Sequence, residues 1–204
     1  MKKIFLLILC GGMVACGAPT ETPKKEEKQA VAVEPPTTSY TTYVNPLMGT
    51  DSTFELSNGN TYPAIAVPWG MHFWTPQTGK MGDGWAYQYH AQKIRGFKQT
   101  HQPSPWINDY GAFALMPVVG DLKIKEDERA SWFSHKTETA QPHYYQVYLA
   151  DYDTTVEITP TNRAAQFRFT FPETDKAYLL LDAFFKGSKV QVLPQERKII
   201  GYAR

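Results

Sequence analysis

The chain has 204 residues, of which 42% are hydrophobic, 14% aromatic and 20% charged, and its formal net charge is +1. Without residues 1–15, which contain Lys2 and Lys3, 19 of the 21 Lys and Arg remain against 20 Asp and Glu, a formal charge of −1. This composition offers no basic surface able to displace counterions from a phosphate backbone, so nucleic acid is excluded as a partner.

The first sixteen residues have the architecture of a secretory signal. Two lysines precede an apolar run from Ile4 to Leu9, which is too short to span a bilayer permanently, and the small residue Ala15 precedes Cys16. The pattern resembles a bacterial lipobox, which predicts a signal peptide over residues 1–15 and a lipid anchor in the membrane at Cys16. An ordinary cleaved signal with an incidental cysteine is the alternative.

Residues 16–39 are dominated by Pro, Thr, Lys and Glu and contain no large apolar residue beyond Val31 and Val33. Such a segment cannot bury enough apolar surface to fold, so we expect a lipidated, disordered tether between the membrane and a folded body. The expected location is the cell envelope of a Gram-negative bacterium, on the periplasmic or the outer face of the outer membrane.

Residues 40–204 are long enough for one domain with its own core. Within them, the stretch from Ser57 to Pro117 contains four of the five tryptophans and three of the five histidines. Aromatic faces with amides and imidazoles suit a polar ligand with apolar faces, such as a sugar. A Trp-rich core is the alternative. Trp69 is assigned to the core, because Pro68 and Gly70 beside it are expected to mark a strand that enters the sandwich.

Period-two alternation follows from Phe113 onward and predicts an all-β fold, an antiparallel β-sandwich. Arg168 between Phe167 and Phe169 indicates a strand with one buried and one wet face. One short helical turn is expected within residues 127–133. The expected strands lie near residues 113–116, 122–125, 144–149, 155–158, 165–171, 178–182, 190–192 and 198–202.

The last two strands are expected to form a hairpin with its turn at Pro194 to Arg197. The second strand still alternates at Arg204, the last residue. A domain that ends within a strand leaves an unpaired edge, so the sandwich is expected to be incomplete at its C-terminal end.

Four blocks resemble the N-terminal domain of glycoside hydrolase family 92, a family of bacterial exo-acting α-mannosidases, in their order and spacing. They are VNPLMGT (Val44 to Thr50), GNTYPAIAVPWGMHFWTPQTG (Gly59 to Gly79), GWAYQYHAQKIRGFKQTH (Gly84 to His101) and NDYGAFALMP (Asn108 to Pro117). The third block departs from the family's usual GFSHTH, since Lys98 and Gln99 replace its Ser-His pair.

The resemblance implies a two-part enzyme in which an N-terminal β-sandwich and a C-terminal helical barrel enclose a pocket for mannose-containing glycans. It also implies a calcium ion in that pocket and hydrolysis with inversion, by a general acid and a general base that both lie in the barrel. The barrel is missing from this chain, so we expect the chain by itself not to be catalytic and not to hold calcium.

The resemblance also implies sugar contacts within the chain. Trp85 is expected to stack on mannose, with core packing as the alternative, and His101 is either a sugar contact or an ordinary loop histidine. Asp109 is either a sugar contact or a turn residue that caps its own backbone. Thr50 belongs to a loop that in the family lies beside the pocket.

Two hypotheses about the function therefore remain, one for an enzyme domain and one for a binding or structural protein. The chain is either the pocket-lining N-terminal domain of an α-mannosidase or a free-standing lipoprotein with a carbohydrate-binding or structural role at the surface.

Overall fold

The computed structural model describes residues 39–51, 61–80, 87–100, 113–183 and 188–202. The chain divides into two units, Met1–Thr37 and Thr38–Arg204, and all described residues lie in the second. The predicted signal peptide, Cys16 and the tether up to residue 38 lie outside the described residues. No helix in the described ranges has both the length and the apolar character needed to cross a membrane.

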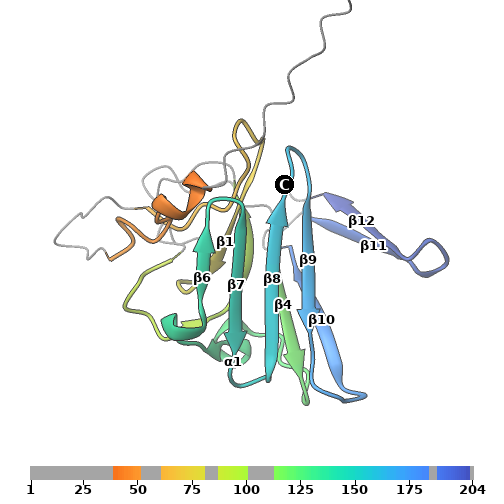
Figure 1. Cartoon of the computed structure of the whole chain (residues 1–204). Coiled ribbons are helices and arrows are strands. Elements are labelled where there is room, and N and C mark those ends of the chain that lie inside the picture. The colour runs from red at the N-terminus through yellow and green to blue at the C-terminus, as the bar shows by residue number, and fades with distance from the viewer. Residues whose placement is uncertain (1–38, 52–60, 81–86, 101–112, 184–187, 203–204) are drawn as a thin grey trace, which may run out of the picture. The chain divides into compact units, whose positions relative to one another are not determined.

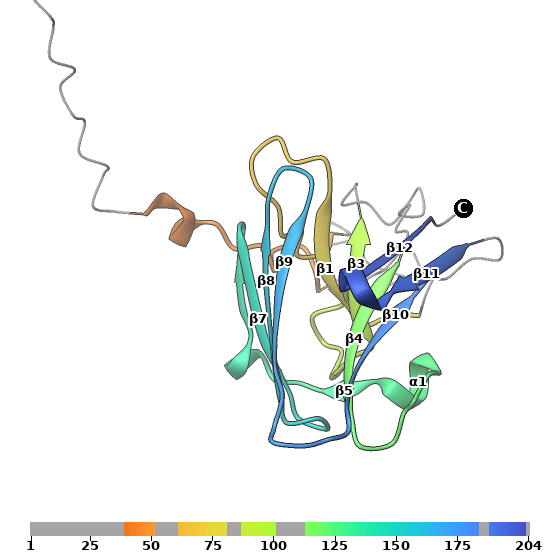
Figure 2. The same ribbon diagram turned by 90° about the vertical axis from the view of Figure 1, so that its right-hand side faces the viewer.

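The fold is an all-β sandwich of two four-stranded antiparallel sheets, as the alternation predicts (Figure 1). Figure 2 shows the two sheets as separate layers. The first has the order β1-β3-β4-β10 and the second β6-β7-β8-β9. The bounds of the first sheet are β1 (Phe73–Gln77), β3 (Gly96–Thr100), β4 (Ala114–Val119) and β10 (Ala177–Asp182). Those of the second are β6 (Thr139–Gln141), β7 (Tyr144–Leu149), β8 (Thr154–Pro160) and β9 (Ala165–Thr170).

Short elements complete the described chain. They are η1 (Tyr40–Tyr43), β2 (Lys93–Ile94), α1 (Glu126–Arg129), β5 (Ser131–Trp132), η3 (His135–Thr137), β11 (Lys189–Leu193), η4 (Pro194–Glu196) and β12 (Lys198–Tyr202). β2 pairs with β5, and β11 pairs with β12. The predicted hairpin is confirmed, and Arg197 closes its turn in the left-handed conformation with φ 51°.

The core lies between the sheets, and alternate residues of β7 and β8 are buried in it. β7 alternates half-buried and buried residues along its length, and β9 alternates half-buried and exposed residues, with Arg168 on the wet face. Phe97 on β3 contacts Tyr145 on β7, with ring centroids 6.3 Å apart. The buried core residues are Ile65, Trp74, Ile94, Phe97, Met116, Val118, Tyr145, Val147, Leu149, Tyr152, Val156 and Ile158.

Two expectations about local structure are wrong. Trp69 is 97% exposed rather than in the core, because it lies in a turn closed by the Gly70 N–H to Val67 carbonyl hydrogen bond of 3.0 Å. Residues 122–125 form no strand, and Leu122 and Ile124 are exposed. Gly120, with φ 86°, follows directly after β4, and the chain continues from there toward α1 rather than into a paired strand.

Arg129 fastens α1 to the first sheet. Its side chain is 2% exposed and forms an ion pair with Asp182 of β10, with Nη1 and Oδ2 2.7 Å apart. Its Nε also donates to the Arg95 carbonyl oxygen at 3.0 Å. Removal of this buried guanidinium is costly, because the Arg95 carbonyl oxygen loses its donor and the partly exposed Asp182 loses its counter-charge.

We therefore predict that Arg129→Met lowers the free energy of unfolding by about 1 to 3 kcal/mol. The matched control is Arg168→Met, since Arg168 pairs with Glu157 from a side chain that is 71% exposed and its loss should cost less than about 1 kcal/mol. Urea unfolding followed by circular dichroism measures both. An equal decrease in the free energy of unfolding in the two variants would contradict the view that Arg129 stabilises the packing of α1 on the first sheet.

Candidate functional site

The loop from Val44 to Thr50 is ordered by its own hydrogen bonds. The Asn45 side-chain oxygen accepts from the Leu47 N–H at 3.0 Å, and the Thr50 hydroxyl donates to the Leu47 carbonyl oxygen at 2.7 Å. Gly49 has φ 79°, a conformation that favours glycine. Thr50 is 1% exposed and its hydroxyl proton serves the loop, so a sugar contact through the lone pairs of this hydroxyl stays a prediction.

Two contacts tie this loop to the segment before β2. The Tyr89 N–H donates to the Thr50 carbonyl oxygen at 3.0 Å. His90 Nδ1 lies 3.3 Å from an Asp51 carboxylate oxygen in an exposed pair. The loop and residues 87–92, far apart in the family blocks, are therefore neighbours.

A hollow of about 480 Å³ lies beside this junction. Its volume is within the range of small-ligand sites. Aromatic rings, imidazoles, an amide and an ammonium group surround it, which is the mixture that suits a hydroxyl-rich ligand with an apolar face. Its lining includes Tyr89, His90, Gln92, Phe133, His135 and Lys136.

A buried carboxylate lies behind this hollow. The Glu138 side chain has no exposed surface, and His135 Nδ1 lies 2.5 Å from its Oε2. Tyr145 donates to Oε1 at 2.6 Å, and the Tyr87 hydroxyl is 3.1 Å from both oxygens. These partners meet the requirement that a buried charge be paired and hydrogen-bonded.

The two phenols are held in their protonated form. Burial raises the pKa of Tyr87 far above its ordinary value of 10.0, and the Glu138 charge raises it further. The same two causes, in the same order, raise the pKa of Tyr145. Both hydroxyls therefore remain donors to Glu138 across the physiological range.

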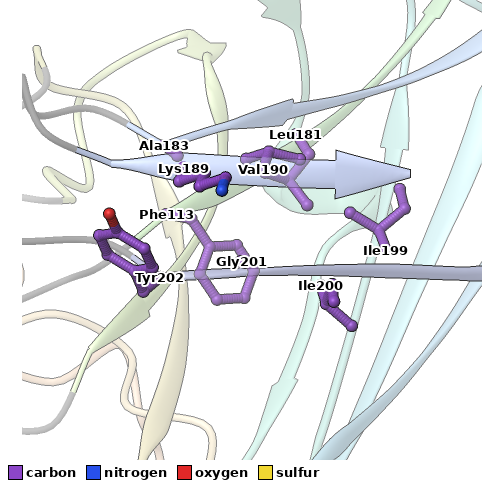
Figure 3. A pocket seen from close by; sticks show the side chains of 9 residues that line it. All are labelled: Phe113, Leu181, Ala183, Lys189, Val190, Ile199, Ile200, Gly201 and Tyr202. Atoms are coloured by element: carbon purple, nitrogen blue, oxygen red, sulfur yellow. The ribbon is translucent and has the colours of Figure 1, made fainter. Parts of the chain in front are cut away.

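A second hollow, of about 300 Å³, is apolar and lies between the end of β10 and the β11–β12 hairpin (Figure 3). The Gly201 position admits no side chain, since a Cβ there would lie 2.3 Å from the Lys189 carbonyl oxygen. The hollow offers one ammonium group and one phenol but no carboxylate or imidazole. It is lined chiefly by Phe113, Leu181, Val190, Ile199, Ile200 and Tyr202.

Most residues predicted to contact sugar cannot be located. Trp85, His101 and Asp109 lie outside the described residues, as does Cys16. Thr50 is described and lies next to the first hollow through its hydrogen bond with Tyr89. Lys98, a departure from the family pattern, lies on β3 and is 3% exposed.

The carboxylates of the described ranges are poor candidates for acid and base chemistry. Glu138 is enclosed, Glu157 pairs with Arg168, and Asp182 pairs with Arg129. Asp51 is exposed and pairs with His90.

Calcium does not fit the described residues. They contain no group of three His, Cys, Asp or Glu side chains that could hold a metal ion. Three carbonyl oxygens of the Val44–Thr50 loop already accept protein donors: Gly49 from the Thr61 N–H, Met48 from the Thr61 hydroxyl and Thr50 from the Tyr89 N–H. Hard cations need several such oxygens free at once.

Tyr87 and Tyr89 lie within the third family block, but nothing in the sequence alone links them to Glu138. The available signal is the three-residue spacing of His135 and Glu138 before a strand, which is common in ordinary turns. Their association depends on a contact between residues 51 positions apart, from Tyr87 to Glu138, which no local pattern encodes.

The model of the glycosyl hydrolase family 92 N-terminal domain matches residues 43–204. The chain belongs to glycosyl hydrolase family 92. It is similar to an inverting mannosidase of that family from Bacteroides thetaiotaomicron, with 49% identity and a TM-score of 0.79. The match covers 84% of this chain and 23% of that one.

Two further family 92 structures are similar. An α-mannosidase from Bacteroides thetaiotaomicron is 36% identical with a TM-score of 0.63, over 70% of this chain and 20% of that one. The glycosyl hydrolase ccman5 is 25% identical with a TM-score of 0.66, over 76% of this chain and 22% of that one. No curated protein sequence matches. The chain thus spans about a quarter or less of the solved relatives and carries their N-terminal domain.

The phenol–carboxylate network predicts loss of stability at alkaline pH. Because the pKa values of Tyr87 and Tyr145 are raised in the folded state, the unfolded chain releases these protons first as the pH rises above 10.0. Stability is fully present below pH 10 and should then fall by about 1.4 kcal/mol per pH unit for each tyrosine.

Urea unfolding at a series of pH values between 9 and 11.5 measures this slope. Tyr87→Phe should flatten it, whereas Tyr202→Phe should not, because Tyr202 is 60% exposed. An unchanged slope in Tyr87→Phe would argue against the coupling of its phenol to folding.

Proposed function

We propose that the chain is the pocket-lining N-terminal domain of an inverting, calcium-dependent exo-α-mannosidase that acts on mannose-containing glycans. The observation that carries the proposal is the 49% identity to an inverting mannosidase over 84% of the chain. The free-standing lipoprotein hypothesis is not favoured, because the similar structures are parts of much longer family 92 glycosidases.

In this proposal the chain binds and orients sugar and leaves proton transfer to the C-terminal helical barrel. An inverting glycosidase needs two carboxyl groups roughly 6.5–9.5 Å apart, with a water between one of them and the sugar ring. The enclosed or paired state of Glu138, Glu157 and Asp182 supports an origin of both groups outside the described residues. The same origin is proposed for the calcium ligands, since the described ranges contain no group of three His, Cys, Asp or Glu side chains that could hold a metal ion.

Sugar contacts are proposed for Trp85, by stacking, and for His101, Asp109 and Thr50, by hydrogen bonding. The position of the Thr50 loop next to a hollow with aromatic and polar lining supports a binding surface on this side of the domain. A stacked indole contributes most when the ring of the sugar flattens toward the transition state, so its loss should affect more than ground-state binding.

The reading frame after the codon for Arg204 is expected to encode the barrel, and the longer protein to release mannose from an α-mannoside first as the β-anomer. Proton NMR of the fresh product measures the anomer. In that protein Trp85→Ala should lower kcat/KM by at least about tenfold, which is about 1.4 kcal/mol of transition-state stabilisation.

Trp69→Ala is the control, because Trp69 is 97% exposed in a turn. An α-anomer as first product, or an unrelated sequence after a stop codon, would overturn the proposed function. A normal kcat/KM in Trp85→Ala would instead remove only the proposed role of that indole.

We also propose that Cys16 carries a lipid that anchors the protein in the outer membrane. The basis is the lipobox-like sequence before Cys16 and the polar composition of residues 17–39. Cys16→Ser should move the protein from the membrane fraction to the soluble fraction in a detergent partition, and Cys10→Ser should not. Retention of Cys16→Ser in the membrane fraction would refute the anchor.

A further inference from the structure

A continuous series of contacts leads from the core to the loop that contains Thr50. It begins at Tyr145 on β7, whose hydroxyl donates to Glu138, and passes to His135 on η3. The His135 ring stacks on the Tyr89 ring, with centroids 3.9 Å apart and planes 3° apart. Tyr89 then bonds to Thr50 through its backbone N–H.

His135 faces an acceptor with each of its ring nitrogens. Nδ1 lies 2.5 Å from Glu138 Oε2, and Nε2 lies 2.7 Å from the Tyr89 carbonyl oxygen. A carbonyl oxygen has no proton to donate, so Nε2 carries one. The contact with Glu138 also needs a proton, which a neutral imidazole with a protonated Nε2 does not supply.

Glu138 is a poor host for that second proton. Oε1 accepts a hydrogen bond from Tyr145, and the single Tyr87 proton is shared between Oε1 and Oε2, each 3.1 Å from the phenol oxygen. An ionised carboxylate accepts on both oxygens, whereas a carboxylic acid uses one of them as a donor. The arrangement therefore favours an imidazolium paired with a carboxylate, a charge-assisted hydrogen bond of the strong kind.

Among the contacts of the described residues, no Lys or Arg side chain pairs with Glu138 in place of His135. The ring meets Glu138 on its own turn, Tyr89 from the segment before β2, and Phe133 at an angle of 85°. Tyr87 approaches Glu138 from the same segment as Tyr89. Tyr145 approaches Glu138 from β7. Lys136 and His90 line the same hollow, and His90 pairs with Asp51.

We propose that His135 is a positioning residue, which with both ring nitrogens protonated bridges Glu138 and Tyr89 and thereby holds Tyr89 against the Thr50 loop. The proposal rests on the proposed function only in assigning this loop and the hollow beside it to a sugar site. It adds that the geometry of this part of the site depends on one retained proton. Loss of that proton would set an imidazole lone pair against a carboxylate oxygen and weaken both the stack and the Tyr89 hydrogen bond.

The first measurement is the protonation state of the His135 side chain in the full chain at pH 8. Nitrogen-15 NMR that correlates ring nitrogens with ring protons distinguishes an imidazolium from either neutral tautomer. His135 is expected to show two protonated nitrogens, with the exposed His143 as the internal reference. Glu138→Gln, which keeps the shape but removes the charge, should convert His135 to a neutral ring. A neutral His135 in the unaltered chain would overturn the proposal.

The second measurement is amide hydrogen exchange, which reports local opening. His135→Phe keeps an aromatic ring beside Tyr89 but removes both N–H donors, so exchange at the Tyr89 amide should become at least tenfold faster. The Val147 amide in the core of β7 should not change. His143→Gln is the matched control. Unchanged exchange at Tyr89 in a folded His135→Phe variant would refute positioning by His135.

If His135→Phe fails to fold, a pH series on the unaltered chain takes its place. Exchange at Tyr89, corrected for base catalysis by comparison with Val147, should accelerate tenfold or more as His135 loses its proton by NMR. An exchange rate at the Tyr89 amide that does not change with the protonation of His135 would count against the proposal. Both measurements are made without sugar, so failure of the proposed function alone would leave their expected results intact. Titration with α-mannobiose tests that function separately, through shifts at Tyr89 and Gln92.

Discussion

The carboxylate of Glu138 has no contact with solvent, and its need for hydrogen-bond donors joins parts of the chain that would otherwise be independent. One donor, Tyr145, is a core residue of the second sheet. Another, Tyr87, packs with Tyr62, whose hydroxyl is 2.5 Å from that of Thr100 at the end of β3. The third, His135, reaches the segment beside the Thr50 loop. The sandwich core and the candidate site therefore share one polar network.

The sandwich itself forms because apolar side chains alternate along its strands. This signal is clear in β7, β8 and β9, where each strand has one face against the core, and these strands were predictable from the sequence. β1 and β3 lie in the aromatic stretch and were missed. Almost every residue of these strands is buried, including polar Thr75, Gln77 and Lys98, so the two-residue period is lost. Pro76 within β1 weakens the signal further.

The corrections have the same physical origin. Leu122 and Ile124 alternate with lysines as a strand would, but alternation predicts a strand only where a neighbour supplies hydrogen bonds. Trp69 was assigned to the core by its flanking residues, yet its positive φ places it at a turn. The ordered family blocks led to the correct family. They could not reveal the Glu138 network, since its members come from separate turns and strands brought together only by folding.

The Val44–Thr50 loop has most of its polar groups engaged before any ligand arrives. Asn45 and Thr50 satisfy groups within it, Thr61 contacts two of its carbonyl oxygens, and Tyr89 fixes its end. Binding usually costs conformational entropy when loops must order around a ligand. A ligand that meets this loop finds that ordering already complete, so the surface is preorganised and more of each new contact is available as affinity. In the proposed sugar site, the same property makes the loop selective by shape, because rearranging to fit a ligand of different outline would break these hydrogen bonds.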